Sequence, residues 1–323
     1  MKKMAFLVVF LSLLITHPTV GQQQTGPANP PPVNPDNGEA QIHKLSSNLY
    51  WIQFVGVNGG NFGGNVVASV GDDGIVLVDA GYAPMAPKLA AALKTLSDKP
   101  VKYILHTHWH VDHTQADEYF AGTAVIIAQD NVRTRMQTGS KRFPPMPATS
   151  YPSITFSHQI TLHINGGEIH GIHFPAGHTD GDTIYFYPGA NVVQTGDDFT
   201  NFNPRNFSAF DQDTDGSGSP QGIIAAGEYV LAHSNEDVKI IPGHGNMVTR
   251  ADMAQDLAFL EAATAAVQAG IDQGKSVDQL KEEKVLANID TLGLGPMKED
   301  AAIQRLYTNL TLRRTLTESG GAH

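Results

Sequence analysis

Six consecutive residues, 108–113, carry most of the metal-binding side chains and read HWHVDH. They follow an apolar stretch, residues 101–105, that is predicted to be a buried strand. On an extended backbone, residues i and i+2 point to the same side, so the imidazoles of His108 and His110 can meet one ion. Asp112 and His113 lie where the chain turns into the next predicted helix and can face a second ion nearby. Nitrogen and carboxylate donors in this pattern favour Zn²⁺, which takes three protein ligands plus water when it is catalytic.

Three later motifs offer the remaining ligands. They are GHT at 177–179, TGD at 195–197 and PGHG at 242–245, and each comes at the end of a predicted strand. In α/β proteins, functional sites assemble in the loops at the carboxyl ends of strands. The candidate ligands in these motifs are His178, Asp197 and His244.

In this order, the motifs HxHxDH, GHT, TGD and PGHG resemble those of the metallo-β-lactamase superfamily over most of residues 42–250. The resemblance implies an α/β fold: an αββα four-layer sandwich of two mixed β-sheets flanked by helices, with the site at one sheet edge. It also implies two Zn²⁺ per chain. The ligands it implies are His108, His110 and His178 for the first zinc, Asp112, His113 and His244 for the second, and Asp197 as a bridge. Asp79, at the end of a predicted strand, matches a family aspartate that supports the ligands, although a plain turn or helix-cap role is an open alternative.

A water shared by two zinc ions loses its proton near neutral pH and becomes a bound hydroxide nucleophile. Asp112 is the catalytic candidate because it can orient this nucleophile or pass on its proton. Some β-lactamases of the family use a cysteine at the second zinc, and this chain has none. Others put serine where Asp197 stands, so Asp197 resembles instead the hydroxyacylglutathione hydrolases, lactonases and phosphodiesterases. The family's di-iron oxygen reductases carry Glu where this chain has His110, which argues against redox chemistry.

The sequence therefore predicts a binuclear zinc hydrolase that opens a carbonyl–heteroatom bond of a small molecule: a β-lactam, a lactone, or another ester or thioester. A phosphodiesterase of the same fold and a non-catalytic zinc-binding protein are the alternatives. Trp109, Phe199 and Tyr151 are candidates for an apolar rim around the metals, with ordinary packing as the alternative, and Arg205 for binding a substrate carboxylate. The glycine-rich segment 58–64 is predicted to be a flexible hairpin tip that could join the rim.

Several other residues resemble ligands but are interpreted differently. His106 lies further back on its strand and is predicted to be structural. The histidines 158, 163, 170 and 173 fall in predicted strands as solvated residues, with His173 the nearest to the site. Asp211–Gly216 starts like a calcium loop, but its twelfth position is Gly222 rather than Glu. We expect an acidic loop bordering the site there.

The motifs need a layered scaffold. Continuous or alternating apolar runs predict strands at 49–57, 65–70, 75–79, 101–105, 124–128, 160–164, 168–174, 183–187, 191–195 and 238–241. Helical patterns fall at 87–96, 114–120, 131–137 and 221–233, and from 249 onward. Strands that alternate with helices indicate α/β layers.

The composition and the N-terminal residues indicate the cellular compartment and the classes of partner that the protein can bind. The chain has 323 residues and a net charge of −11, which disfavours nucleic acid and anionic lipid as partners and leaves a small-molecule substrate. Lys2 and Lys3 precede an apolar run, residues 5–15, that is too short to span a bilayer. We expect a signal peptide at 1–21, a disordered Pro/Gln-rich linker at 22–40 and one domain at 41–323 with a helical C-terminal tail. The mature protein would be periplasmic or secreted, without stable membrane insertion.

Overall fold

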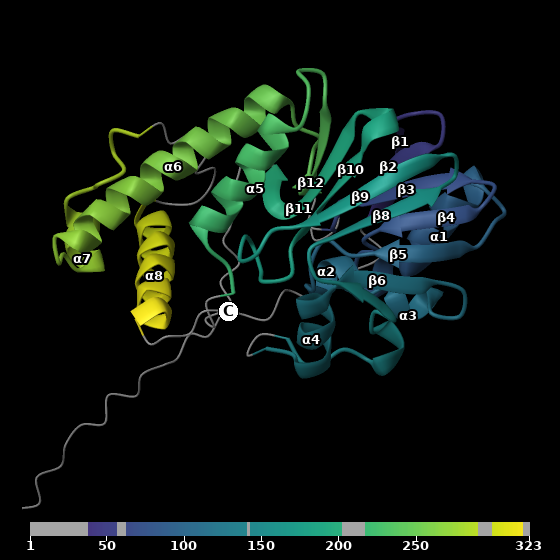
Figure 1. Ribbon diagram of the computed structural model, residues 1–323, viewed down its shortest axis with the longest axis horizontal. Helices are drawn as coiled ribbons and strands as arrows, with labels where there is room; N and C mark the ends of the chain where they lie inside the picture. The colour runs from purple at the N-terminus through teal and green to yellow at the C-terminus, as the bar shows by residue number, and fades with distance from the viewer. Residues whose placement is uncertain (1–37, 57–62, 141–142, 202–216, 290–298, 319–323) are drawn as a thin grey trace, which may run out of the picture. The chain divides into compact units, whose positions relative to one another are not determined.

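The computed structural model describes residues 38–56, 63–140, 143–201, 217–289 and 299–318 (Figure 1). All of them belong to one compact unit, Pro32–His323. The predicted signal peptide and nearly all of the predicted linker lie outside the described residues. Among the described residues, no helix has both the length and the apolar character needed to cross a membrane.

The first sheet contains seven strands arranged in chain order. They are β1 (Glu39–Lys44), β2 (Leu49–Val55), β3 (Val66–Gly71), β4 (Gly74–Val78), β5 (Val101–Leu105), β6 (Val125–Gln129) and β7 (Ile154–Phe156). Strands β1 to β4 pair antiparallel, whereas β4 to β7 pair parallel, so the sheet is mixed.

The second sheet contains five strands in the order β12-β11-β10-β9-β8. They are β8 (Gln159–Ile164), β9 (Gly167–His173), β10 (Thr183–Tyr187), β11 (Val192–Asn201) and β12 (Lys239–Gly245). Strands β11 and β12 pair parallel, and the other pairs are antiparallel. The carboxyl ends of β11 and β12 therefore meet at one edge of this sheet.

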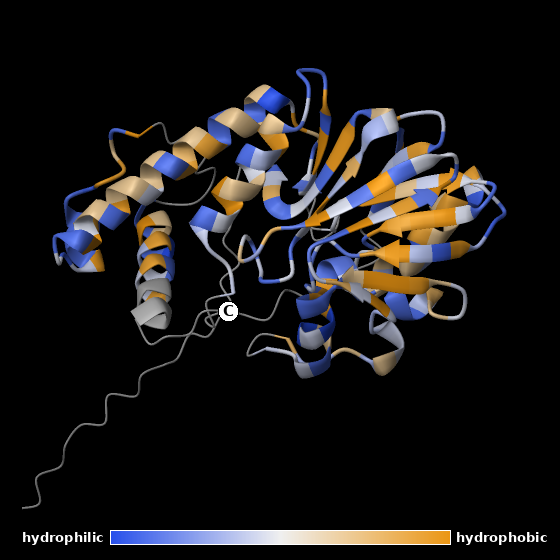
Figure 2. Cartoon of the chain, in the orientation of Figure 1, coloured by the Kyte–Doolittle hydropathy of each residue, from blue (hydrophilic) through white to orange (hydrophobic). Residues whose placement is uncertain are grey.

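The side chains of β4 show why the two sheets stack. Ile75 and Leu77 point into the cluster that also contains Leu89 of helix α1 (Ala86–Leu96), whereas Val76 and Val78 point into the cluster between the sheets. Successive residues of a strand face opposite sides, so a strand that is apolar throughout is covered on both faces. Figure 2 shows hydrophobic residues along the strands of both sheets.

Helices cover the outer face of each sheet. Helix α1 packs on the first sheet, and helices α5 (Pro220–Ala232) and α6 (Arg250–Asp272) pack on the second, where Ala226 and Leu257 meet Ile240 of β12. In Figure 1, α1 lies on one side of the two sheets and α5 and α6 lie on the other. The order helix, sheet, sheet, helix confirms the predicted αββα sandwich of two mixed sheets.

The C-terminal region adds a helical layer beyond α5. Helix α6 begins at a capping box in which Thr249 and Asp252 satisfy each other's backbone amides. Its apolar side packs with α7 (Val277–Glu282) and α8 (Glu299–Glu318) around Leu280, Leu286 and Leu306. The same cluster includes Ile223 of α5, so the C-terminal helices pack against the rest of the folded unit.

Strands β11 and β12 continue to Asn201 and Gly245, past their predicted ends at 195 and 241, and the structure differs from the sequence-based elements in three further places. Strand β1 begins at Glu39, two residues before the predicted start of the domain, and β7 falls where no strand was predicted. The predicted helix at 114–120 is instead two single turns, α2 (Val111–Thr114) and α3 (Asp117–Phe120). The carbonyl of His113 accepts bonds from the amides of residues 80 and 81, so it cannot continue a helix to Asp117.

Candidate metal centre

The loops and strand ends at one side of the sandwich bring all seven predicted ligands together. His108 and His110 lie between β5 and α2, Asp112 and His113 lie on α2, and His178 lies in the loop between β9 and β10. Asp197 and His244 come from β11 and β12. They form one group of His108, His110 and His178 and a second of Asp112, His113, Asp197 and His244, with the ligand atoms of each group within 4.8 Å of one another.

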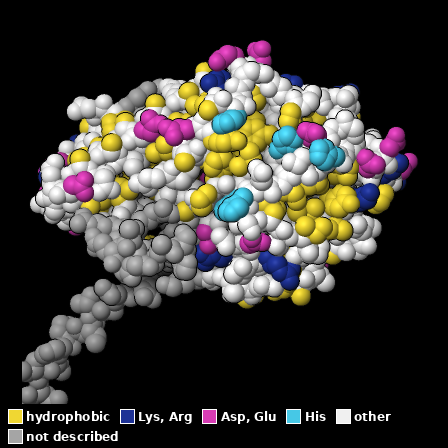
Figure 3. All heavy atoms as spheres, in the orientation of Figure 1, with side chains coloured by type: hydrophobic (Ala, Val, Ile, Leu, Met, Phe, Trp, Pro, Cys, Tyr) yellow, Lys and Arg dark blue, Asp and Glu magenta, His cyan; other side chains and the backbone are white. Residues whose placement is uncertain are grey.

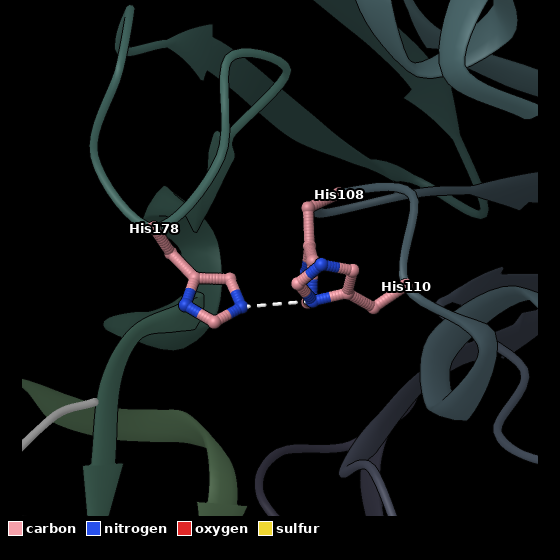
Figure 4. Close-up of side chains that lie close together, drawn as sticks. All are labelled: His108, His110 and His178. Atoms are coloured by element: carbon pink, nitrogen blue, oxygen red, sulfur yellow. Dashed lines mark hydrogen bonds between the residues drawn. The ribbon is translucent and has the colours of Figure 1, made fainter. Parts of the chain in front are cut away.

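The first group consists of three buried imidazoles. Nε2 of His178 lies 3.0 Å from Nδ1 of His110, and the ring of His108 points toward the same place (Figure 4). Nδ1 of His108 lies 3.0 Å from the hydroxyl of Thr107, while its Nε2 is buried and has no hydrogen-bond partner among the described residues. Two nitrogens bound to one tetrahedral zinc would lie about 3.3 Å apart. The His178–His110 distance is close to this value, and the ligand atoms of all three histidines lie within 4.8 Å of one another, so the group can form a three-histidine shell.

The second group combines two imidazoles and two carboxylates. Nε2 of His244 lies 2.9 Å from Oδ2 of Asp112, 3.3 Å from Nε2 of His113 and 3.4 Å from Oδ2 of Asp197. The same oxygen of Asp197 lies 3.5 Å from Nε2 of His178 in the first group. Asp197 thus stands between the two groups, where a bridging ligand would stand.

Asp79 braces ligands of both groups. Its Oδ2 lies 2.9 Å from Nδ1 of His113 and accepts the hydroxyl hydrogen bond of Thr107 at 2.8 Å. Since that hydroxyl donates to Asp79, it accepts from Nδ1 of His108, which leaves Nε2 of both histidines free to face an ion. Asp79 is fully buried and has φ +63°, a conformation that costs a non-glycine residue about 1 kcal/mol or more. The structure favours the support role over a plain turn role.

His106 is buried and paired with Asp117, in agreement with its predicted structural role. Its Nε2 lies 2.8 Å from Oδ2 of Asp117, and its Nδ1 lies 3.7 Å from Oδ1 of Asp79. Burial alone would lower the pKa of His106, but the carboxylates of Asp117 and Asp79 raise it from 6.5 to about 9. Burial raises the pKa of Asp117 from 3.8 to about 6. A chain of buried charges therefore runs from Asp117 through His106 to Asp79.

The carboxylates control the charge of the second group. Burial alone would lower the pKa of His113, but Asp197, Asp112 and Asp79 outweigh it and raise that pKa well above its usual value. In return, His113 and His244 hold the pKa values of Asp112 and Asp197 below their usual range against the effect of burial. In the first group, burial and the nearby His113 lower the pKa of His108. At neutral pH and without a metal ion, the carboxylates of the second group are therefore ionised and His113 is protonated, so a metal ion that binds there would displace the proton of His113, whereas His108 of the first group is already neutral.

Asp182, Asp198 and Thr107 also shape the site and were not predicted to do so. Oδ1 of Asp198 accepts the backbone N–H of His178 at 3.0 Å, and Asp182 accepts both the amide and the hydroxyl of Thr179. Burial and the neighbouring carboxyl of Asp198 raise the pKa of Asp182 well above its usual range. The sequence signals were present, because Asp182 lies three residues after the GHT motif, Asp198 directly follows the TGD motif and Thr107 precedes His108.

A bulge directs Asp197 toward the other candidate ligands. The pairing of β11 with β12 shifts register on both sides of Gly196, which has φ +55°. A Cβ at this position would lie 2.6 Å from Cβ of Thr107, so only glycine fits. Bulges of this kind redirect a side chain at the edge of a site.

Two of the four predicted substrate contacts are corrected by the structure. Trp109 is 2% exposed and packs against Phe143, while Phe199 is 3% exposed and packs among the residues under α5 and α6. Both serve the core because their rings lie in apolar clusters, so neither forms an open rim. Tyr151 is half-buried beside Arg133, at the border of the Trp109 cluster. Arg205, residues 58–62 of the glycine-rich segment and the loop 211–216 lie outside the described residues.

Histidines also occur away from the metal centre, and Figure 3 shows several on one face of the molecule. His158 and His163 are exposed, and His163 and His170 both contact Glu168, at 3.2 Å and 2.8 Å. His173 is half-buried, and its Nδ1 lies 2.7 Å from the backbone carbonyl of Asp182. None of these four belongs to the two ligand groups found among the described residues.

Known proteins resemble this chain in sequence and in fold. A relative, 2,4-dinitroanisole O-demethylase subunit alpha from Nocardioides sp. (strain JS1661), is 28% identical over 133 residues. The match covers 41% of this chain and 40% of the relative, so the chain spans less than half the length of that curated protein.

Solved structures share the fold at low sequence identity. A metallo-beta-lactamase from Pontibacter korlensis matches 69% of this chain and 99% of its own, with 18% identity and a TM-score of 0.57. The DIM-1 metallo-beta-lactamase matches 72% of this chain and 100% of its own, with 17% identity and a TM-score of 0.54. The stereoselective inverting sec-alkylsulfatase Pisa1 from Pseudomonas sp. matches 88% of this chain and 55% of its own, with 14% identity and a TM-score of 0.66.

The sequence model of the family described as the metallo-beta-lactamase superfamily matches residues 59–244, more than half of the chain. That range ends on His244 and contains the seven clustered donors. A match over 88% of the chain cannot fit within residues 1–244, so the likeness to the sulfatase extends into the C-terminal helical region. The sequence match and the αββα sandwich lead to one conclusion: the chain belongs to the metallo-β-lactamase superfamily.

Proposed function

We propose that the protein is a zinc-dependent hydrolase that binds two Zn²⁺ ions and opens a carbonyl–heteroatom bond of a small molecule. One observation carries the proposal: seven nitrogen and oxygen donors converge as two adjacent groups with Asp197 between them. The chain has no cysteine, and imidazole with carboxylate is a donor set that suits zinc. The buried Nε2 of His108, without a partner among the described residues, is an atom that a bound ion would satisfy.

Two zinc ions supply Lewis acidity and lower the pKa of bound water to about 7. The surrounding residues supply orientation. The Asp112 side chain is 17% exposed, against 10% for Asp197 and 6% for His244, so it is the donor of its group that faces solvent most. Its pKa is held below the usual range, so it is ionised at neutral pH and can orient an attacking water by accepting a hydrogen bond from it.

The substrate class rests on charge and on the first group. The three imidazoles of the first group are neutral ligands, so an ion bound there would keep its full positive charge. Such an ion would polarise the carbonyl oxygen of a substrate. The net charge of −11 works against long anionic substrates such as nucleic acid. The first substrates to assay are therefore β-lactams, lactones, other esters and thioesters. Bis-aryl phosphates test the phosphodiesterase alternative. A secondary alkyl sulfate and an aryl methyl ether are added because of the names of two similar proteins.

The test begins with the zinc content of the purified mature chain, followed by turnover of each substrate with and without a chelator. We expect two zinc ions per chain and chelator-sensitive hydrolysis of at least one carbonyl substrate. His178→Ala, which removes a buried donor, should lose an ion and most of the activity. His163→Ala, which removes an exposed histidine of β8, is the matched control and should lose neither.

The outcomes separate the alternatives. Turnover of bis-aryl phosphates alone would establish the phosphodiesterase. Two bound ions without turnover of any substrate would favour the non-catalytic zinc-binding protein. Fewer than two ions in zinc-replete buffer would refute the binuclear site.

We also propose that the chain is exported and acts in the periplasm or outside the cell. The support is the pair Lys2 and Lys3 before the apolar run 5–15, followed by a polar, proline-rich stretch. N-terminal sequencing of the protein after expression in a bacterium should find a start near Gln22 in the exported fraction. An uncleaved cytosolic chain would contradict the proposal.

A further inference from the structure

The segment that carries His244 is held by a side chain from the other sheet. Asn65 directly precedes β3 and is fully buried. Its Nδ2 donates to the carbonyl of Pro242 at 2.8 Å and to that of Gly245 at 3.1 Å, while its backbone N–H donates to the carbonyl of Gly243 at 2.8 Å. One residue thus makes three hydrogen bonds to the four-residue stretch that contains His244.

A second buried amide completes the arrangement. Nε2 of Gln53, on β2, donates to the same carbonyl of Gly245 at 2.9 Å and to Oδ1 of Asn246 at 3.1 Å. Gln53 is 3% exposed, so neither amide exchanges these bonds easily for water. We call Asn65 and Gln53 the amide clasp.

The amide clasp lies beside the second ligand group. Gly64, next to Asn65, packs so closely that a Cβ there would lie 2.6 Å from the backbone carbonyl of Asp112 and 3.1 Å from the ring of His113. The imidazole of His244 meets the other donors of this group at 2.9 to 3.4 Å, so a small shift of its backbone would open the group. The first group is held differently, through Thr107 and Asp79.

We propose that Asn65 and Gln53 are positioning residues that fix His244 and thereby determine the affinity of the second metal position. The inference rests on the proposed binding of two zinc ions. The two amides touch no ligand atom directly. They hold the backbone on both sides of His244, and the loss of such a support typically costs 10- to 100-fold in metal affinity. The three-histidine position has its own supports and should keep its affinity.

The test compares size-matched variants that lack the donors. Asn65→Leu removes two side-chain bonds and Gln53→Met removes two others. Asn165→Gly is the matched control, because Nδ2 of Asn165 also donates to two backbone carbonyls, of Ser69 and Gly74, in the turn region at the far end of β3. Glycine keeps the positive φ of that position (52° in Asn165), so the control loses the bonds without new backbone strain.

Zinc affinity is measured by competition with a chromophoric chelator, and the Co²⁺-loaded proteins are compared by their visible absorption spectra. In Asn65→Leu, we expect the second ion to bind 10- to 100-fold more weakly and its cobalt bands to change, while the first ion changes less than about threefold. Gln53→Met should show the same pattern more weakly and serves if Asn65→Leu does not fold. Asn165→Gly should lower the unfolding midpoint without a change in either affinity.

Equal weakening of both ions in Asn65→Leu, or no weakening, overturns the amide clasp, as does an equal loss in the control. The wild-type zinc count separates the two ideas. Two ions in the wild type and an unchanged second affinity in the variants refute the amide clasp alone. A wild type that binds one ion refutes the binuclear site and the amide clasp together.

Discussion

The buried pair of His106 and Asp117 should make the metal-free protein less stable as the pH rises. Folding raises the pKa of His106 from 6.5 to about 9, so the folded chain binds this proton more tightly than the unfolded chain. The resulting stabilisation is fully present below pH 6.5 and is lost as the pH rises through 9. At about 1.4 kcal/mol for each pKa unit, the loss amounts to about 3 kcal/mol.

The perturbation is the double replacement His106→Gln with Asp117→Asn, which keeps the shape of the pair and removes both titrating groups. The pKa of Asp117, raised to about 6, adds a loss of the same sign at lower pH, because a carboxyl that is easier to protonate in the folded state is destabilising once it ionises. Site residues that do not contact the pair titrate alike in both proteins and cancel when one stability curve is subtracted from the other, whereas the contact of His106 with Asp79 is part of the measured difference.

Urea unfolding at pH 6.5, 7.5 and 9 with a chelator present is the assay, since bound metal has its own pH dependence. The difference in unfolding free energy, wild type minus double variant, should fall by about 3 kcal/mol across this range. A flat or rising difference would show that His106 does not hold its proton as the contacts with Asp117 and Asp79 require.

Three further outcomes are expected. Thr107→Val removes the hydroxyl between His108 and Asp79, and chelator competition should show a 10- to 100-fold weaker first ion, with unchanged affinity contradicting its role. Zinc at 100 times its dissociation constant should stabilise the chelator-stripped protein by about 2.7 kcal/mol in thermal unfolding, and no shift would mean that folding does not form the site. Leu306→Ala, in the core of the C-terminal helices, should cost about 2–5 kcal/mol of stability and leave the zinc content unchanged, since that cluster contains no ligand; lost zinc would tie the two regions together.

The candidate ligands could be predicted because each one combines a metal-binding side chain with a recognisable neighbourhood. His178, Asp197 and His244 are far apart in the sequence, yet each stands beside a glycine just after a stretch that is predicted to be a strand. That pattern depends on local backbone geometry, which sequence encodes directly. The layered fold followed for the same reason, because β4 reads as an apolar run that must be covered on both faces.

The amide clasp could not be predicted, because it depends on contacts between distant segments. Asn65 looks like an ordinary residue at the edge of a glycine-rich stretch, and only the stacking of the two sheets brings it to Pro242 and Gly245. The prediction that Trp109 belongs to the rim of the site was wrong for a related reason. Its position between two ligands suggests a rim, but the strand-to-helix turn directs its ring into the cluster with Phe143. An aromatic beside a ligand can pack inward or outward, and the local sequence does not distinguish the two.

The supports also connect the two metal positions through one carboxylate. Asp79 reaches the second group directly through His113 and the first group through Thr107 and His108, all within buried surroundings. Asp79 also lies near His106, whose positive charge offsets that of the carboxylate. Asp79 can therefore stay ionised although it is buried away from water. A change at Asp79 should therefore disturb both ions, whereas a change at Thr107 or at Asn65 should disturb mainly one. Thr107 and Asn65 would thus each set the metal affinity of one ligand group. Asp79, which both groups share, would set how the two groups are placed relative to each other.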